Sequence, residues 1–246
     1  MGRLPTYQLL ADQLRAQITS GALRPGDRLP TEPELCARSG VSRSTVREAL
    51  RLLASQHLIV TTRGMAGGSF VAEPSPARLG DLLSTGLNLL MAAGTVTAEQ
   101  WFEVRETFEV PAAGLAARRR TEAHLAELDE TLFDPDSAGL DVIMPAHRRF
   151  HRRLAEATGN PLYELITHPL YEVANELTLG EHAPAGFWHQ VDTHHRAILR
   201  AVTVGDAPAA RGAARAHLEH IRGAPAWHCG SSLAPHLRDL DYLPLP

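Results

Sequence analysis

The chain has 246 residues, of which 44% are hydrophobic and 21% are charged, which is the composition of an ordinary globular protein rather than a disordered or fibrous one. The net charge of −4 does not by itself predict a nucleic-acid partner, but residues 1–75 carry nine arginines against six acidic residues, and the rest is acidic, which predicts two domains with different tasks. The chain has no apolar run of about 18 residues and only two cysteines, far apart, so we expect a cytoplasmic protein with neither a membrane span nor a disulfide framework.

The first predicted domain, residues 1–74, contains three helices followed by a β-hairpin. Thr31 and Glu34 form a capping box at the start of the second helix, and Ser42 is placed to cap the third. A glycine-rich link joins two short β-prone stretches. This order is that of a winged helix-turn-helix. The expected helices span 6–20, 31–40 and 43–55, and the expected strands span 58–62 and 69–72.

Beyond the boundary at Pro74–Pro76, the sequence predicts helices only. The fold class is therefore mainly α, with a small β-hairpin in the first domain and an all-helical bundle over residues 77–223. A tail rich in proline and glycine, residues 224–246, follows. The expected helices span 79–93, 97–120, 121–132, 141–158, 161–179, 186–204 and 206–222.

The start of the third helix carries the side chains expected to read DNA. Arg43 and Arg47 are four residues apart and so share one helical face, where one can bind a guanine edge in a major groove and the other can reach a guanine or a phosphate. Ser44 and Thr45 suit phosphates or thymine methyl groups. Two isolated arginines would more often be a solvated helix face, but the helix-turn-helix context and the hairpin favour DNA binding. Arg63, Gly67 and Gly68 lie in the expected wing.

These segments resemble a known family. PGDRLPTEPEL, GVSRSTVREALRLL and GGSFVAEP resemble the N-terminal domain of the GntR family of bacterial transcription regulators. The resemblance implies operator binding through the named residues, and a homodimer that reads an inverted repeat in double-stranded DNA. Helices 79–93 and 97–120 are candidates for the subunit contact. One departure is Pro33, which stands where the family usually has a DNA-contacting arginine. The resemblance leaves open whether the protein represses or activates transcription.

Histidines suggest a metal site in the second domain. His147 and His151 are four residues apart on one predicted helix, so their imidazoles point to the same side, and His195 and His217 lie on two later helices. Imidazoles converging from separate helices suit Zn²⁺, Ni²⁺ or another divalent ion. Taken singly, each histidine is more often a core or surface side chain, and spacing alone does not show convergence.

Residues 78–222 resemble the all-helical FCD effector domain of the FadR subgroup. His151 in RRFHRRLAEATGNPL, His195 in HHRAIL and His217 in RAHL match the three metal-binding histidines of many members. The fourth ligand is usually an aspartate, and His147 stands at that position. The exchange leaves a bound ion more positive and favours nitrogen-preferring metals, or it means that the site no longer binds metal.

The expected effector is a small carboxylate. Arg105 resembles the family arginine that faces the effector pocket, where its guanidinium would bind a carboxylate. The alternative is an ion pair with Glu109, or a surface contact such as that with Glu106. Asn175 is a further candidate pocket residue.

Two other functions compete with a metal-centred regulator. The histidine cluster could serve a metal-dependent hydrolase, but the sequence shows no general base beside it and no nucleophile motif, and a hydrolase would not need the DNA-binding domain. A metal-free sensor of the acyl-CoA type is the second alternative, and the histidine set argues against it.

Overall fold

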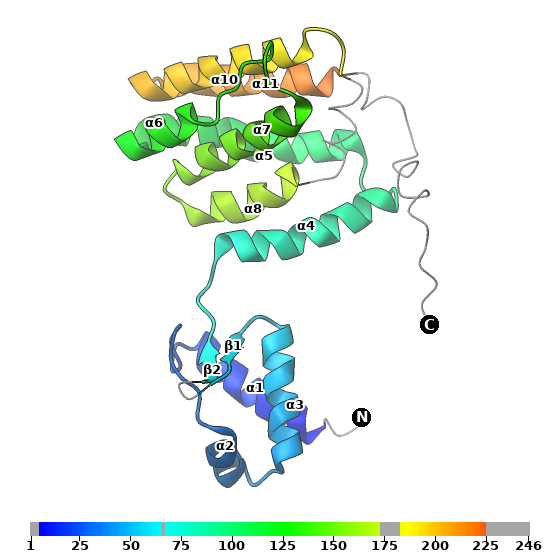
Figure 1. Cartoon of the computed structure of the whole chain (residues 1–246), viewed down its shortest axis with the longest axis vertical. Coiled ribbons are helices and arrows are strands. Elements are labelled where there is room, and N and C mark those ends of the chain that lie inside the picture. Colours follow the sequence, from blue (N-terminus) through cyan, green and yellow to red (C-terminus); the bar gives the residue numbers. More distant parts are fainter. Residues whose placement is uncertain (1–4, 65–66, 173–182, 225–246) are drawn as a thin grey trace. The chain divides into compact units, whose positions relative to one another are not determined.

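The computed structural model describes residues 5–64, 67–172 and 183–224, and Figure 1 shows how their helices and strands run. The chain divides into two compact units between Ser75 and Pro76. Each unit has its own hydrophobic core. Within the described ranges, no helix is both long and apolar enough to cross a membrane.

Local capping interactions start the helices of the first unit. The backbone N–H of Thr31 donates to the Glu34 carboxylate (2.7 Å), and the backbone N–H of Thr45 donates to the Ser42 hydroxyl (3.2 Å). The elements of this unit are α1 (Thr6–Thr19), α2 (Glu32–Ser39), α3 (Arg43–Ser55), β1 (Ile59–Thr62) and β2 (Gly68–Val71).

The two strands form an antiparallel hairpin in which Ile59 pairs with Val71 and Thr62 pairs with Gly68. Ile59 and Val71 point into a core that also contains Val46 of α3, so the hairpin and the helices share one apolar interior. The predicted order of three helices and a hairpin, a winged helix-turn-helix, is confirmed.

The described part of the second unit is entirely helical, as predicted. The hydroxyl of Thr97 accepts a hydrogen bond from the backbone N–H of Gln100 (3.2 Å), and Asn160 and Asp206 cap later helices in the same way. The helices are α4 (Pro76–Ala92), α5 (Ala98–Arg119), α6 (Glu122–Asp129), α7 (Leu140–Glu156), α8 (Pro161–Tyr171), α10 (Phe187–Val204) and α11 (Ala207–Arg222).

Three helix ends differ from the sequence prediction by three residues or more. α4 begins at Pro76, three residues earlier than expected, because proline at the first helical position loses no hydrogen bond. α6 ends at Asp129 rather than at 132. The helix predicted over 161–179 runs to Tyr171 in the structure, and its later part falls outside the described residues.

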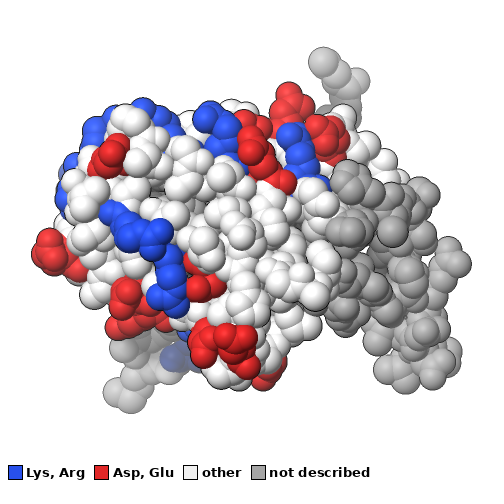
Figure 2. Space-filling model, turned by 90° about the horizontal axis from the view of Figure 1, so that it is seen from above, with Lys and Arg blue, Asp and Glu red and all other residues white. Residues whose placement is uncertain are grey.

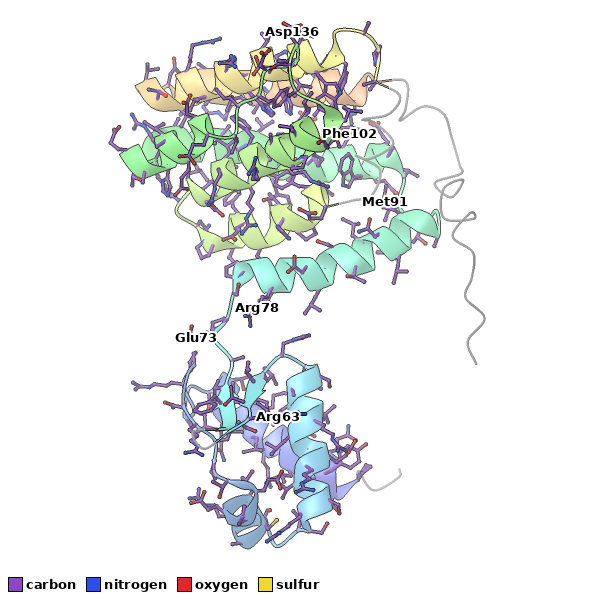
Figure 3. All side chains as sticks on the ribbon, in the orientation of Figure 1. Arg63, Glu73, Arg78, Met91, Phe102 and Asp136 are labelled. Atoms are coloured by element: carbon purple, nitrogen blue, oxygen red, sulfur yellow. The ribbon has the colours of Figure 1, made fainter. Side chains whose placement is uncertain are left out.

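Four helices of the second unit surround one interior. α5 packs against α7, α10 and α11, and α4 runs along α8 (Figure 1). Small side chains such as Ala113 and Ala117 let α5 approach its neighbours closely. A second apolar cluster includes Met91 and Phe102, both labelled in Figure 3. This packing brings polar side chains of α5, α7, α10 and α11 into the same buried space.

Candidate functional site

The structure brings together all four histidines that the sequence singled out. His147 and His151 come from α7, His195 from α10 and His217 from α11, and every one of them is buried. One ring nitrogen from each lies within 4.8 Å of those of the other three. The four imidazoles therefore form one cluster, which we call the His cluster, and it could hold a metal ion.

The spacing inside the His cluster suits ligands of one ion. His147 Nδ1 lies 3.1 Å from His195 Nε2, and His151 Nε2 lies 3.0 Å from His217 Nε2. Two nitrogen ligands about 2.1 Å from one ion are about 3.0 Å apart when their bonds form a right angle, and about 3.4 Å apart at the tetrahedral angle. The same distances also suit hydrogen bonds between neutral imidazoles.

Aromatic rings hold the cluster in place. Phe150 stacks on His195 with ring centroids 3.9 Å apart, and Tyr171 of α8 stacks on His151 at 5.1 Å. The outward-facing Nδ1 atoms of His195 and His217 are buried and have no hydrogen-bond partner among the described residues. On their outer sides these two rings are therefore held by packing alone, whereas their Nε2 atoms face the other imidazoles of the cluster.

A buried ion pair on α5 supports the cluster from behind. Glu109 Oε2 accepts a hydrogen bond from His151 Nδ1 (3.1 Å), and Glu109 Oε1 accepts one from Arg105 Nε (2.5 Å). A carboxylate that accepts from the outer nitrogen of a ligand histidine fixes its tautomer and aims the inner lone pair at the metal. The guanidinium of Arg105 also lies over the ring of Trp101, at 4.6 Å.

Burial keeps the imidazoles neutral. Loss of hydration lowers the pKa of His147, His195 and His217 well below the usual value, and charge on neighbouring imidazoles lowers them further. Burial also lowers the pKa of His151, although Glu109 opposes this. Burial raises the pKa of Glu109, but Arg105 and His151 outweigh it and lower that pKa to about 2. The cluster therefore offers neutral nitrogen donors beside an ionised carboxylate, a donor set that fits Zn²⁺ or Ni²⁺.

Two other residues of the second unit, Arg105 and Asn175, were predicted to bind the effector. Arg105 is completely buried and pairs with Glu109, so its acidic partner is not Glu106, whose carboxylate instead contacts Arg215 at 3.4 Å. Asn175 lies outside the described residues. Sequence reasoning named Glu109 only as a partner for Arg105 and missed its contact with His151. Its spacing of four residues from Arg105 was the only local signal.

The residues predicted to read DNA lie at the start of α3. Arg43, Ser44 and Arg47 are exposed, and Thr45 is half-buried with its hydroxyl 2.8 Å from that of Ser42. Arg47 Nε pairs with Glu32 Oε2 of α2 at 2.9 Å. An exposed pair of this kind is worth at most about 1 kcal/mol, so Arg47 can exchange it for DNA at little cost.

The wing glycines meet a packing requirement. A Cβ atom on Gly67 would lie 2.6 Å from the Thr62 carbonyl oxygen, and one on Gly68 would lie 2.8 Å from Arg28 Nε. Arg28 also donates to the carbonyl of Gly67 (2.6 Å) and so holds the returning strand. Arg63, at the end of β1, is exposed and is labelled in Figure 3.

Charge on the face of the molecule in Figure 2 is mixed. Arginine and acidic side chains lie in small neighbouring groups with uncharged areas between them. The described side chains of that face therefore present no continuous basic surface of the kind that binds nucleic acid.

Comparison with known proteins assigns the class. Residues 6–71 match the family described as "Bacterial regulatory proteins, gntR family", and residues 100–220 match the FCD domain. The chain therefore belongs to the GntR family of DNA-binding transcription regulators, in the FadR subgroup that carries an FCD domain. Members of this family are regulators rather than enzymes, which removes the hydrolase alternative.

Individual relatives support the family assignment over most of the chain. HTH-type transcriptional regulator LutR of Bacillus subtilis is 32% identical over 214 residues, covering 83% of this chain and 94% of that protein. A putative L-lactate dehydrogenase operon regulatory protein of Escherichia coli is 30% identical over 217 residues, covering 86% and 83%. Among solved structures, a Streptococcus agalactiae GntR protein matches with a TM-score of 0.58 and 25% identity over 88% of this chain and 98% of that one.

Proposed function

We propose that this regulator binds an inverted-repeat operator as a homodimer, and that a small carboxylate bound at a divalent transition metal in the His cluster changes its operator affinity. The observation that carries the proposal is the convergence of four buried, neutral imidazoles from three helices. Zn²⁺ and Ni²⁺ are the favoured ions because every donor is an imidazole nitrogen. The metal would supply an open coordination position to a carboxylate oxygen.

The charge around the His cluster favours an anionic effector. The four imidazoles are neutral, and the negative charge of Glu109 is balanced by the positive charge of Arg105 at 2.5 Å. A divalent cation would therefore bring its full charge into a buried space, which is costly without a counter-ion. An entering carboxylate offsets part of that charge.

Two further features limit the range of compounds expected to act as the effector. Arg105 lies beside the cluster, close enough that its charge lowers the pKa of His147, and its guanidinium is the proposed second anchor for the carboxylate, with Asn175 as a further candidate contact. The E. coli relative is named for an L-lactate dehydrogenase operon, so L-lactate is the first compound to test. The metal-free acyl-CoA alternative gives no role to four converging imidazoles.

The proposed DNA contacts are Arg43, Ser44, Thr45 and Arg47 in the major groove, with Arg63, Gly67 and Gly68 of the wing against the backbone. Reading an inverted repeat requires the DNA-binding units of two subunits, related by two-fold symmetry. An effector then acts by favouring one spacing of these two DNA-binding units over another, and a few kcal/mol of differential affinity is enough to switch operator occupancy.

The subunit contact is assigned to α4. Its exposed side chains include leucines that recur at spacings of three, four and seven residues, which form an apolar stripe of the kind that protein interfaces cover. These leucines are Leu79, Leu82, Leu83, Leu89 and Leu90. On α5, by contrast, ten of the 22 residues are already buried within its own unit.

Metal content tests the proposal directly. The purified protein should contain close to one Zn²⁺ or Ni²⁺ per chain, and the double variant His151→Ala/His195→Ala should lose it together with the operator response to L-lactate. His189→Ala is a matched control because its side chain is on α10 but 55% exposed. Full metal content in the double variant, or a native protein that takes up neither ion, would refute the assignment. Circular dichroism checks that each variant is folded.

A further inference from the structure

A polar cavity lies outside the His cluster, where α7 and α8 meet. Its volume is about 220 Å³, and it is lined by Pro145, Arg148, Arg149, Arg152, His168, Tyr171 and Glu172. We call it the α7–α8 cleft. Pockets that hold drug-sized ligands measure about 300–1,000 Å³, so this cleft suits a smaller molecule.

The lining of the cleft carries an excess of positive charge. Among the described residues that line it, three are arginines and one, Glu172, is acidic. Arg152 is partly neutralised by Glu156 at 3.2 Å and Glu164 at 3.9 Å. No acidic side chain in the described ranges lies within ion-pair distance of Arg148 or Arg149. Two guanidinium groups are therefore left to attract an anion.

The wall of the cleft is connected to α4. His168 of α8 lines the cleft, and its Nε2 lies 2.9 Å from Asp81 Oδ1 on the first turns of α4. Gly80 of α4 packs so closely on the same ring that a Cβ atom there would lie 2.6 Å from His168 Cδ2. A ligand that moves the His168 ring must therefore move α4 or break this contact.

One residue that lines the cleft also contacts the His cluster. Tyr171 lines the cleft and stacks on His151, with ring centroids 5.1 Å apart. Arg148 is adjacent in sequence to His147 but lines the cleft instead. The cleft and the His cluster are thus neighbouring, separate sites.

We propose that the α7–α8 cleft is a second ligand site, which binds a small polyanion carrying two or more carboxylate or phosphate groups and reports its binding to α4 through His168 and Asp81. Arg148 and Arg149 supply forked donors that match the oxygens of either group. Binding here requires neither the metal nor the carboxylate of the proposed function, so the two assignments stand or fall separately.

The test is calorimetric titration of the full-length, metal-loaded protein at about 50 mM salt, where screening is weak. Tricarballylate is the polycarboxylate probe and inorganic phosphate is the phosphate probe, so the preferred chemistry is measured rather than assumed. Metal content before and after each titration excludes removal of the ion by the probe. The variants are Arg148→Gln/Arg149→Gln and, as a control, Arg200→Gln, an exposed arginine of α10 outside the cleft.

We expect saturable binding of at least one probe by the native protein and by Arg200→Gln, with affinity at least tenfold weaker in the double variant. Hydrogen exchange should show slower amide exchange over residues 78–90 when the probe is bound, and Asp81→Asn should abolish that slowing while keeping the binding. Equal affinity of the double variant, or no binding to the native protein at 10 mM probe, would overturn the site. Binding without any change in α4 exchange would overturn the connection to α4.

Discussion

Replacing Glu109 with glutamine removes one negative charge from a buried site while keeping the shape of the side chain. In the native protein this carboxylate accepts hydrogen bonds from His151 Nδ1 at 3.1 Å and from Arg105 Nε at 2.5 Å. Breaking a buried ion pair by removing one partner costs about 3–5 kcal/mol, because the other charge stays buried without compensation. Loss of a carboxylate behind a ligand histidine lowers metal affinity about 10–100-fold.

Both effects are measurable on the same protein. Urea unfolding of the metal-free form should show a midpoint lower by about 1 M or more, since the free energy of unfolding falls by about 1–3 kcal/mol per molar urea. Competition with a chelator should show the weaker Zn²⁺ binding. Glu106→Gln is the control, because Glu106 lies on the same helix but pairs with Arg215 at the surface.

A second variant separates charge from shape. Arg105→Met/Glu109→Leu removes both charges, so it should recover most of the stability that Glu109→Gln loses while keeping the weak metal binding, because the outer partner of His151 is still missing. The reasoning is refuted if Glu109→Gln matches Glu106→Gln in both unfolding and metal affinity.

Three further predictions concern pH, the fourth ligand and DNA. Burial lowers the pKa of His147, His195 and His217 in the folded protein, whereas the unfolded chain protonates them near pH 6.5. Their contribution to stability is therefore complete above pH 6.5 and is lost as the pH falls below it. The free energy of unfolding should fall by about 1.4 kcal/mol per histidine per pH unit until the folded-state pKa is reached. Thermal unfolding of metal-free protein between pH 7.5 and 5.5 measures this loss, and a flat profile would contradict it. His147→Asp restores an anionic oxygen ligand and should raise the ratio of Mn²⁺ to Zn²⁺ affinity, read by competitive titration; an unchanged ratio would argue that His147 is not a ligand. Arg47→Ala should weaken specific operator binding by about 1–3 kcal/mol in fluorescence anisotropy, with Arg51→Ala as the control on the same helix, and unchanged affinity and salt dependence would show that α3 does not read the operator.

The sequence predicted the helices well where their starts are determined locally. Ser42, Thr97 and Asn160 each accept a hydrogen bond from a backbone N–H within the next three residues, so the residues that begin a helix are its own neighbours. Helix ends are less local. α6 ends three residues before the predicted position, and the backbone N–H groups of Thr131 and Leu132 donate to carbonyls three residues back, which makes a tighter turn than the α-helix.

The His cluster could be only half predicted from residue spacing. Two histidines four residues apart must share a helical face, and His147 and His151 do. That His195 and His217 meet them depends on how α10 and α11 pack against α5, which no local pattern encodes. The family resemblance supplied that step. The contact between Glu109 and His151 was missed because arginine and glutamate four residues apart are common on exposed helices, and nothing in the segment shows that this pair is buried.

Because the four proposed ligands are neutral, the binding of the metal and the binding of the effector should be coupled. An aspartate ligand would bring a negative charge to the ion, whereas His147 brings none, and Glu109 is already balanced by Arg105. Under the proposed function, a bound carboxylate therefore stabilises the metal, and by linkage the metal raises the affinity for the carboxylate by the same factor. Metal should then be lost more readily to a chelator when no effector is present. The regulator would thus sense two conditions at one site, the supply of a transition metal and the supply of an organic acid.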